Sequence, residues 1–287
     1  MSLRRRVTLP TIAACLVAAA LGSLGLGERT VGDGWLFDLA LVARARIWPP
    51  PAAAPKSEVV VIAVDQRSLD SEALKSVPRA LFSLVWAKLV DGLAAAGARV
   101  VAFDLLLAYS GNSLQAGYDR EFQRVLYRHR ERIVLGRSAR TLPAKPFLAA
   151  LKFDPGGLGL LEIVPDADGV FRRLPTRLQG TDGSEVASLV GAVLSRVGTG
   201  AAPSELMPAP RRHLEALPSY ALIDVLGCLD KAPASLRGAV EGRIVFVGSV
   251  LAEEDRRLPS SRFLPPPVAG EANAVAGCDL PRLGASL

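Results

Sequence analysis

The sequence predicts an α/β fold, with a mixed, largely parallel sheet, flanking helices and a β-hairpin, preceded by one N-terminal transmembrane helix. Three observations lead to this class. A charge-free apolar run covers Thr11 to Gly27. Near-continuous apolar segments such as VVVIAV and RVVAF read as strands that are buried on both faces. A strongly amphipathic helical pattern separates these two segments, and a strand–helix–strand unit joins parallel strands.

The N-terminal part of the chain reads as an anchor followed by a stalk. Three consecutive arginines precede the apolar run, which at about 1.5 Å per residue just spans a hydrocarbon core. We therefore predict a cytoplasmic N-terminus at 1–8, a transmembrane signal anchor at 9–27, and a stalk helix with a proline-rich linker at 28–56. A cleaved signal peptide has the same pattern and stays open as the alternative. In both cases the positive-inside rule places the rest of the chain outside the cytoplasm.

The predicted stalk helix has an apolar stripe. In GWLFDLALVARARIW, which begins at residue 34, Trp35, Leu39 and Val42 fall on one helical face. The following WPPPAAAP ends the helix, because proline lacks an amide donor and blocks helical geometry. The stripe motivates the hypothesis that the stalk forms a homodimer.

Composition argues against a nucleic-acid partner. The formal net charge is +6 at pH 7, but the basic residues are scattered and aromatic residues make up only 6% of the chain. No groove-reading or base-stacking motif is present in the sequence. We therefore assign the basic surplus to a surface close to the membrane, which is the partner that we expect.

A globular domain is predicted at 57–259, followed by a C-terminal tail at 260–287. Ser76 and Pro78 read as the start of the first helix, which is followed by the strand RVVAF. Asp119 reads as the cap of a second helix, and IVLGRS as the next strand. This repeated alternation of strand and helix is typical of an α/β sheet.

The middle of the chain has a different pattern. The segment LGLLEIVPDADGVFRRLPTRL alternates apolar and polar residues around Asp168-Gly169, which predicts a hairpin on or beside the sheet edge. Apolar positions from Val186 to Val197 predict another helix. Ser219 reads as the cap of a short helix, and GRIVFVGSV reads as a final buried strand.

Four residues form the candidate ligand-binding site: Asp65, Ser68, Asp104 and Asp255. Asp65 and Asp104 are expected at the carboxyl ends of parallel strands, where open α/β sheets bind ligands. Asp255, in the charged run EEDRR, follows the final strand and ranks below them. The alternative is that Asp65 caps a turn or helix and Asp104 only ends its strand. Because two carboxylates also permit acid–base chemistry, a secreted α/β hydrolase or transferase is the rival function.

No catalytic residue, metal or cofactor is predicted. Gly248-Ser249 follows a strand, but the motif G-x-S-x-G is absent and the histidines are only His129 and His213. His129 completes an apolar helix stripe, which favours a packed or surface-edge histidine. PDADG lacks the further oxygen ligands of a calcium loop and reads as a turn. The glycine-rich DPGGLGLL lacks the lysine of a phosphate loop.

Cys228 and Cys278 are the two cysteines outside the apolar span, and they form the candidate disulfide in an oxidising compartment. Two unrelated thiols are the alternative, because sequence spacing does not fix the Cα separation that a disulfide needs.

Several segments, taken together and in order, resemble the type-two CHASE domain, the cyclase/histidine-kinase-associated sensory extracellular domain. They are VVVIAVDQRSL, VPRALFSLVWAKLVDGLAAAGARVVAFDLLL, PDADGVFRR, SYALIDVL and GRIVFVGSVLAEEDRRLPSSRF. The similarity covers roughly Val31 to Leu287. One departure is Val77-Pro78, where the family has Trp-Pro.

The resemblance implies a sensory module of a bacterial receptor, of cyclase or kinase type, that binds an unknown ligand. It implies a single-pass inner-membrane location, with the globular domain in the periplasm or outside the cell. It also implies a sensor and not an enzyme, with any catalytic output domain beyond residue 287. Since neither a second membrane span nor an effector domain follows in the sequence, a truncated chain, a fragment and a stand-alone sensor all stay open.

Overall fold

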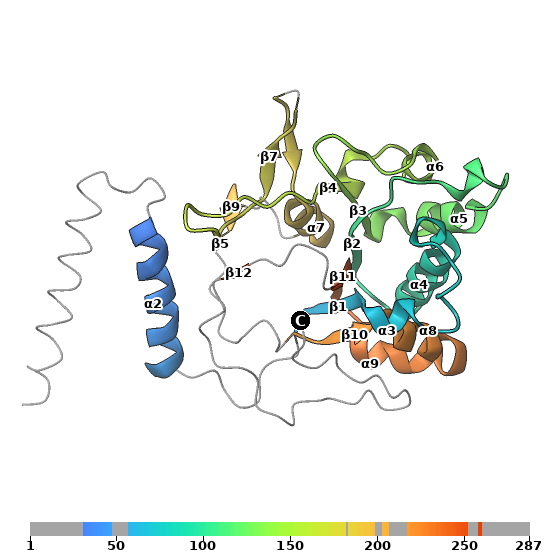
Figure 1. The fold of residues 1–287 in the computed structure, drawn as a ribbon, viewed down its shortest axis with the longest axis horizontal. Coiled ribbons are helices and arrows are strands. Elements are labelled where there is room, and N and C mark those ends of the chain that lie inside the picture. Colours follow the sequence, from blue (N-terminus) through green and yellow to red (C-terminus); the bar gives the residue numbers. More distant parts are fainter. Residues whose placement is uncertain are drawn as a thin grey trace, which may run out of the picture.

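The computed structural model describes residues 31–47, 57–181, 183–198, 203–206, 217–251 and 258–259 (Figure 1). Its centre is a six-stranded sheet of order β10-β1-β11-β2-β3-β4, and every neighbouring pair in this sheet is parallel. The strands are β1 (Val59–Val64), β2 (Val100–Leu106), β3 (Ile133–Arg137), β4 (Leu158–Leu160), β10 (Ser219–Ala221) and β11 (Ile244–Ser249). The predicted α/β class with a largely parallel sheet is confirmed.

Helices cover both faces of this sheet. One face packs against α4 (Ser83–Ala95), α5 (Arg120–His129), α6 (Lys145–Ala150), α8 (Leu222–Lys231) and α9 (Arg237–Val240). The other face packs against α7 (Leu189–Val197), which contacts Val100, Ala102 and Val134. Figure 1 shows α4, α5 and α8 on the side of the sheet opposite to α7.

The larger side of the core is organised by a chain of aromatic rings. Consecutive rings meet edge to face with centroids 5.1–6.4 Å apart, an arrangement that matches the positive edge of one ring to the negative face of the next. The rings belong to Phe82, Trp86, Phe103, Phe122 and Phe147. They connect the sheet to three helices, because Phe103 lies on β2 while Trp86, Phe122 and Phe147 lie on α4, α5 and α6.

The remaining described elements lie outside the central sheet. The other described helices are α2 (Val31–Ile47) and α3 (Gln66–Leu69). Three two-stranded sheets pair β5 (Val170–Phe171) with β12 (Leu258–Pro259), β6 (Leu174–Pro175) with β9 (Glu205–Leu206), and β7 (Arg177–Gln179) with β8 (Glu185–Ala187). The 3₁₀ turns cover Arg79–Leu81, Gly111–Ser113, Arg130–Arg132, Pro155–Gly157 and Pro233–Leu236.

The prediction of a hairpin at Asp168-Gly169 was wrong in its position. The turn itself is present, because Gly169 N donates to the carbonyl of Asp166 at 2.9 Å. However, β4 before the turn is an edge strand parallel to β3, and β5 after it pairs in parallel with β12. The hairpin lies further along the chain, where β7 and β8 pair antiparallel. Alternation alone identified an extended segment but could not identify its partner strand.

Three predicted helix starts are also corrected. Val186 lies in β8, and α7 begins only after Ser188, whose hydroxyl accepts a hydrogen bond from Gly191 N at 3.1 Å. Ser219 lies in β10, and α8 follows it. Pro78 precedes a 3₁₀ turn, so α4 begins at Ser83. Apolar runs of this length fit a strand and a helix equally well, and therefore periodicity misplaced the boundaries.

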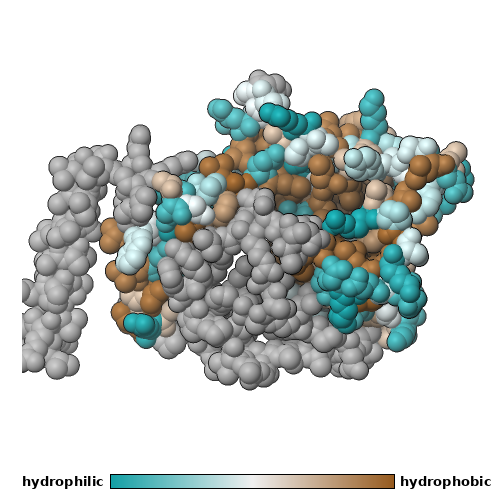
Figure 2. All heavy atoms as spheres, in the orientation of Figure 1, coloured by the Kyte–Doolittle hydropathy of each residue, from teal (hydrophilic) through white to brown (hydrophobic). Residues whose placement is uncertain are grey.

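The predicted stalk is a helix, α2, and its buried face carries no apolar stripe. Gly34, Asp38 and Leu41 are buried, whereas Trp35 and Leu39 are 66% and 56% exposed. Figure 2 shows apolar side chains at the surface of α2, at the left of the view. The anchor predicted at 9–27 lies outside the described residues. Among the helices that the structure describes, none is long and apolar enough to cross a membrane.

Candidate functional site

Asp65 and Ser68 form a helix cap that also joins two elements. The Asp65 carboxylate accepts hydrogen bonds from Ser68 N at 2.9 Å and from the Ser68 hydroxyl, which starts α3 directly after β1. The Ser68 hydroxyl in turn accepts a hydrogen bond from Ile223 N, in α8, at 3.1 Å. Ser68 is fully buried. The helix-cap interpretation of Asp65 is therefore the one that the geometry supports.

Asp104 does not meet Asp65. It lies inside β2, two residues before the strand ends, so the interpretation that it terminates the strand is wrong. Because β11 lies between β1 and β2, the two aspartates are separated by two strand spacings, roughly 10 Å. Asp104 also shares the sheet face of Ala102, which packs against α7. Asp255 lies outside the described residues, and a ligand-binding role for these residues stays a prediction.

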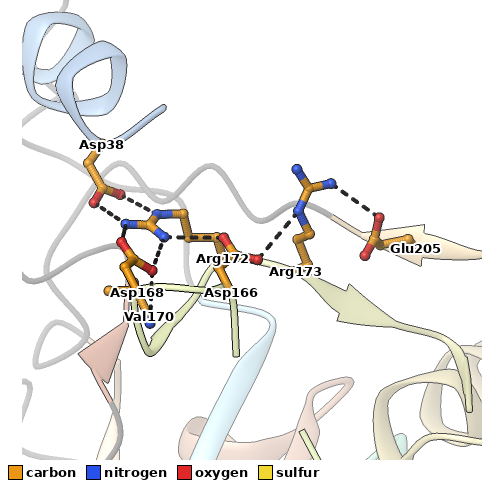
Figure 3. A network of polar contacts seen from close by, with 7 residues as sticks. All are labelled: Asp38, Asp166, Asp168, Val170, Arg172, Arg173 and Glu205. Carbon is orange, nitrogen blue, oxygen red and sulfur yellow. Dashed lines mark hydrogen bonds and ion pairs between the residues drawn. The ribbon is translucent and has the colours of Figure 1, made fainter. Parts of the chain in front are cut away.

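The most elaborate polar arrangement in the described structure surrounds Arg172, whose side chain is 1% exposed (Figure 3). Its Nε and Nη2 donate to the two oxygens of Asp38 at 3.1 and 2.8 Å. Its Nη1 and Nη2 donate to the two oxygens of Asp168 at 2.8 and 2.7 Å. Nη1 also donates to Asp166 at 3.2 Å. A guanidinium group has five N–H bonds, and these five hydrogen bonds use one each.

We call Arg172, Asp38, Asp166 and Asp168 the arginine clamp. The clamp joins distant parts of the chain, since Asp38 lies on α2 and the other three residues flank β5. Gly34 permits the close approach: a Cβ added there would lie 2.5 Å from Arg172 Nη1. Because Gly34 and Asp38 are four residues apart, they share one helix face, and α2 presents that face to the guanidinium.

The clamp carries excess negative charge, which a neighbouring arginine offsets. Arg173 Nε lies 3.5 Å from Asp166, and its Nη1 lies 3.4 Å from Glu205 on β9. The hydrogen bonds from Arg172 lower the pKa of Asp168 to about 2, and the hydrogen bond from Val170 N makes a smaller contribution in the same direction. The same contacts, first with Asp168 and then with Asp38, raise the pKa of Arg172. Asp168 and Arg172 are therefore ionised at neutral pH.

Acid is expected to weaken the clamp. Because the pKa of Asp168 is about 2 in the folded protein and about 3.9 in an unfolded chain, its stabilising contribution is complete above about pH 5. That contribution falls as pH drops through 4 and is lost near pH 2. Urea unfolding at pH 6, 4 and 2.5 measures this loss. Asp168→Asn removes the titrating group, so the difference in stability between the two proteins should shrink with falling pH. A constant difference would contradict the assignment.

Sequence reasoning recognised only parts of the clamp. PDADG was interpreted as a turn and rejected as a calcium loop, and its two carboxylates bind Arg172. Asp38 received no role, although it is one of only two acidic residues on α2, the other being Asp33. The pattern that could have identified Asp38 is its spacing from Gly34. The two residues lie on the same helix face, which therefore combines a position without a side chain and a carboxylate.

His129 and the cysteines received separate predictions. His129 Nε2 lies 2.9 Å from Asp91, and its side chain is 20% exposed, which agrees with a histidine at the edge of the core. The His129 contact, followed by that of Arg128, lowers the pKa of Asp91.

Cys228 is buried on α8 and disulfide-bonded. Its predicted partner, Cys278, lies outside the described residues, as does His213, so the pairing stays a prediction.

Comparison with known proteins gives one match. The model of the CHASE2 domain family matches residues 12–277, a range that includes every residue of the arginine clamp. No curated protein and no solved structure matched the chain.

Proposed function

Because the chain belongs to the CHASE2 domain family, a family of extracellular sensory domains in signalling receptors, we propose that it is the membrane-anchored sensory domain of a bacterial receptor of cyclase or kinase type. In this proposal a single-pass anchor at 9–27 holds it in the inner membrane. The globular part at 57–259, which we call the body, lies in the periplasm or outside the cell. The body binds a small molecule, and the chain itself senses and does not catalyse.

The observation that carries the proposal is the arginine clamp. In the proposed topology α2 directly follows the anchor, so a signal that reaches the cytoplasm through the anchor passes through this helix. The clamp fastens α2 to the body by one bidentate contact, from the buried Arg172 guanidinium to Asp38, and a second bidentate contact, to Asp168, holds that guanidinium within the body. Bidentate pairing fixes both distance and direction, which suits a rigid mechanical connection.

A ligand can change the output only if it binds two arrangements of the receptor with unequal affinity. The clamp provides a basis for two arrangements. When α2 is docked, Asp38 and Arg172 satisfy each other in a buried site. When α2 is released, Asp38 has to return to water, because a buried charge without its partner is strongly unfavourable, whereas Arg172 keeps its contacts with Asp166 and Asp168. Intermediate positions are therefore disfavoured, and α2 behaves as a two-state element.

The test is to fuse a cyclase reporter domain to the cytoplasmic N-terminus of the chain, before the anchor, in a bacterial inner membrane and to measure cyclase output. Asp38→Asn and Arg172→Met should change the basal output by about fivefold or more. Arg177→Met is the matched control, because Arg177 is 59% exposed and forms only a long contact of 3.5 Å with Glu185. Unchanged output in both clamp variants, at equal membrane levels, would exclude transmission through α2.

The exposed face of α2 supports the further proposal of a homodimer through the stalk. Trp35, Leu36, Leu39 and Ile47 are each more than half exposed, and large exposed apolar side chains on one helix are typical of an interaction surface. Single cysteines at Trp35 and Leu39 should crosslink between two copies in the membrane. A cysteine at Leu41, which is 4% exposed, should not. Crosslinking at none of the exposed positions would contradict the dimer.

A further inference from the structure

A cavity of about 340 Å³ opens at the carboxyl ends of the three central strands, beside the start of α4. The volume is at the lower end of the range of about 300–1,000 Å³ for small-molecule sites. Val64, Ser249 and Leu105 contribute the strand side of its wall, and Phe82, Ser83 and Trp86 contribute the helix side. This is the sheet face opposite to Asp104, so the cavity is distinct from the site predicted at the aspartates.

Two hydroxyl groups in the cavity wall lack hydrogen-bond partners. In the part of the chain that the structure describes, Ser83 Oγ and Ser249 Oγ are both buried and neither has a partner. The whole Ser83 residue is only 4% exposed. Most buried polar side chains are hydrogen-bonded, because a buried hydroxyl loses its contacts with water without replacement. Two such groups in one cavity point to a molecule that supplies the missing contacts.

The rest of the wall indicates the chemistry of that molecule. Phe82, Trp86 and Phe147 give the cavity an aromatic lining, and of the charged residues that the structure describes, Arg79 lines the cavity and no carboxylate does. The amino-terminal end of α4 borders the cavity, and its N-cap residue Phe82 has no side chain that could cap the first amides. A helix start and two hydroxyl donors both favour a negative group.

We propose that this cavity binds a small carboxylic acid with an apolar body. The carboxylate accepts hydrogen bonds from Ser83 and Ser249, and the apolar body packs against Phe82, Trp86 and Phe147. The proposal names a ligand class for the proposed sensor and rests on that function for its biological role. Binding itself requires only the cavity, so it can be measured separately from signalling.

The experiment titrates the detergent-solubilised full chain with phenylacetate, and with phenylacetamide as the neutral molecule of matched shape. We expect phenylacetate to raise the melting temperature and to bind at least about tenfold more tightly than phenylacetamide, since hydrogen bonds to a charged group are the stronger ones. Equal affinity for the two compounds, or no binding of phenylacetate, would overturn the carboxylate proposal.

Serine variants test the position of the ligand. Ser83→Ala and Ser249→Ala should each weaken phenylacetate binding about tenfold, because each removes one hydrogen bond to the carboxylate. Without ligand, the same variants should keep or raise the melting temperature, since they delete an unsatisfied buried hydroxyl. A purely structural serine predicts the opposite, a lower melting temperature and unchanged affinity. Ser195→Ala, at an exposed position on α7, is the control and should leave affinity unchanged.

The two proposals fail in different ways. Arg172→Met should still bind phenylacetate, because Arg172 does not line the cavity, and its affinity should shift by the factor by which the ligand biases α2 between its docked and released positions. Loss of phenylacetate binding in every protein, with a clamp-dependent reporter output, would reject the ligand class and leave the receptor function standing. Normal phenylacetate binding, together with a reporter output that does not change in the clamp variants, would reject transmission through α2 and leave the ligand site standing.

Discussion

Replacing Arg172 with methionine is expected to release α2 from the body and to destabilise its docked position by about 3–5 kcal/mol. Methionine fills much of the space of arginine but leaves three carboxylates near one another with no cation between them. The docked helix then carries uncompensated buried charge. Amide hydrogen exchange measures the effect directly: protection of residues 34–47 should be lost, while the amides of β1 and β2 keep theirs.

Two further variants separate charge from shape. Arg172→Lys keeps the charge, but an ammonium group cannot form two bidentate contacts, so partial loss of protection is expected. Arg172→Met combined with Asp38→Leu removes the pair together and should recover part of the loss, because a buried pair often exchanges for apolar groups at little cost. Arg177→Met again serves as the exposed control. Protection of α2 that is unchanged in Arg172→Met would refute the role of the clamp.

Gly191→Ala is expected to destabilise the body by about 1–3 kcal/mol or more. A Cβ at this position of α7 would lie 1.9 Å from the carbonyl oxygen of Thr176, which belongs to the backbone and cannot swing away. The helix would have to move from the segment between β6 and β7. The free energy of unfolding in urea measures the loss.

Gly227→Ala is the matched control, because Gly227 also lies inside a helix, α8, and a Cβ there meets no atom within 4 Å. Alanine has the higher helix propensity, so this variant should be stabilised by about 0.5–1 kcal/mol. Opposite signs for the two substitutions are the expected result. If both variants were stabilised, the close packing of α7 on Thr176 would be incorrect.

The core strands could be predicted from the sequence because burial on both faces requires a continuous run of apolar residues. Segments such as VVVIAV and IVFVGS are nearly free of polar residues, and they form β1 and β11 as expected. The order of the strands in the sheet is not encoded in any comparable local pattern. β11 comes last among the six strands along the chain and inserts between β1 and β2. This insertion places one strand between Asp65 and Asp104, and a shared ligand-binding role for the two aspartates stays a prediction.

The clamp could not be found from local patterns for a related reason. Asp38 and Arg172 are 134 positions apart in sequence, so a local pattern on α2 can identify the carboxylate but not its partner. The buried serines of the cavity raise the same difficulty. Ser249 was considered only as a nucleophile, whereas its missing hydrogen-bond partner is a property of the packed structure. Periodicity reports which side chains are buried, but it does not report what surrounds a buried polar group.

The use of every N–H group of Arg172 has a geometric consequence for α2. Successive residues of an α-helix are turned by about 100° and rise by about 1.5 Å. A twist of α2 by one residue would therefore turn Asp38 away from the guanidinium, and a slide by one residue would break the bidentate fit. The clamp thus fixes the rotation of α2 about its own axis as well as its attachment to the body. In the docked state, α2 can follow the body as a rigid lever, but it can neither roll nor slide against it.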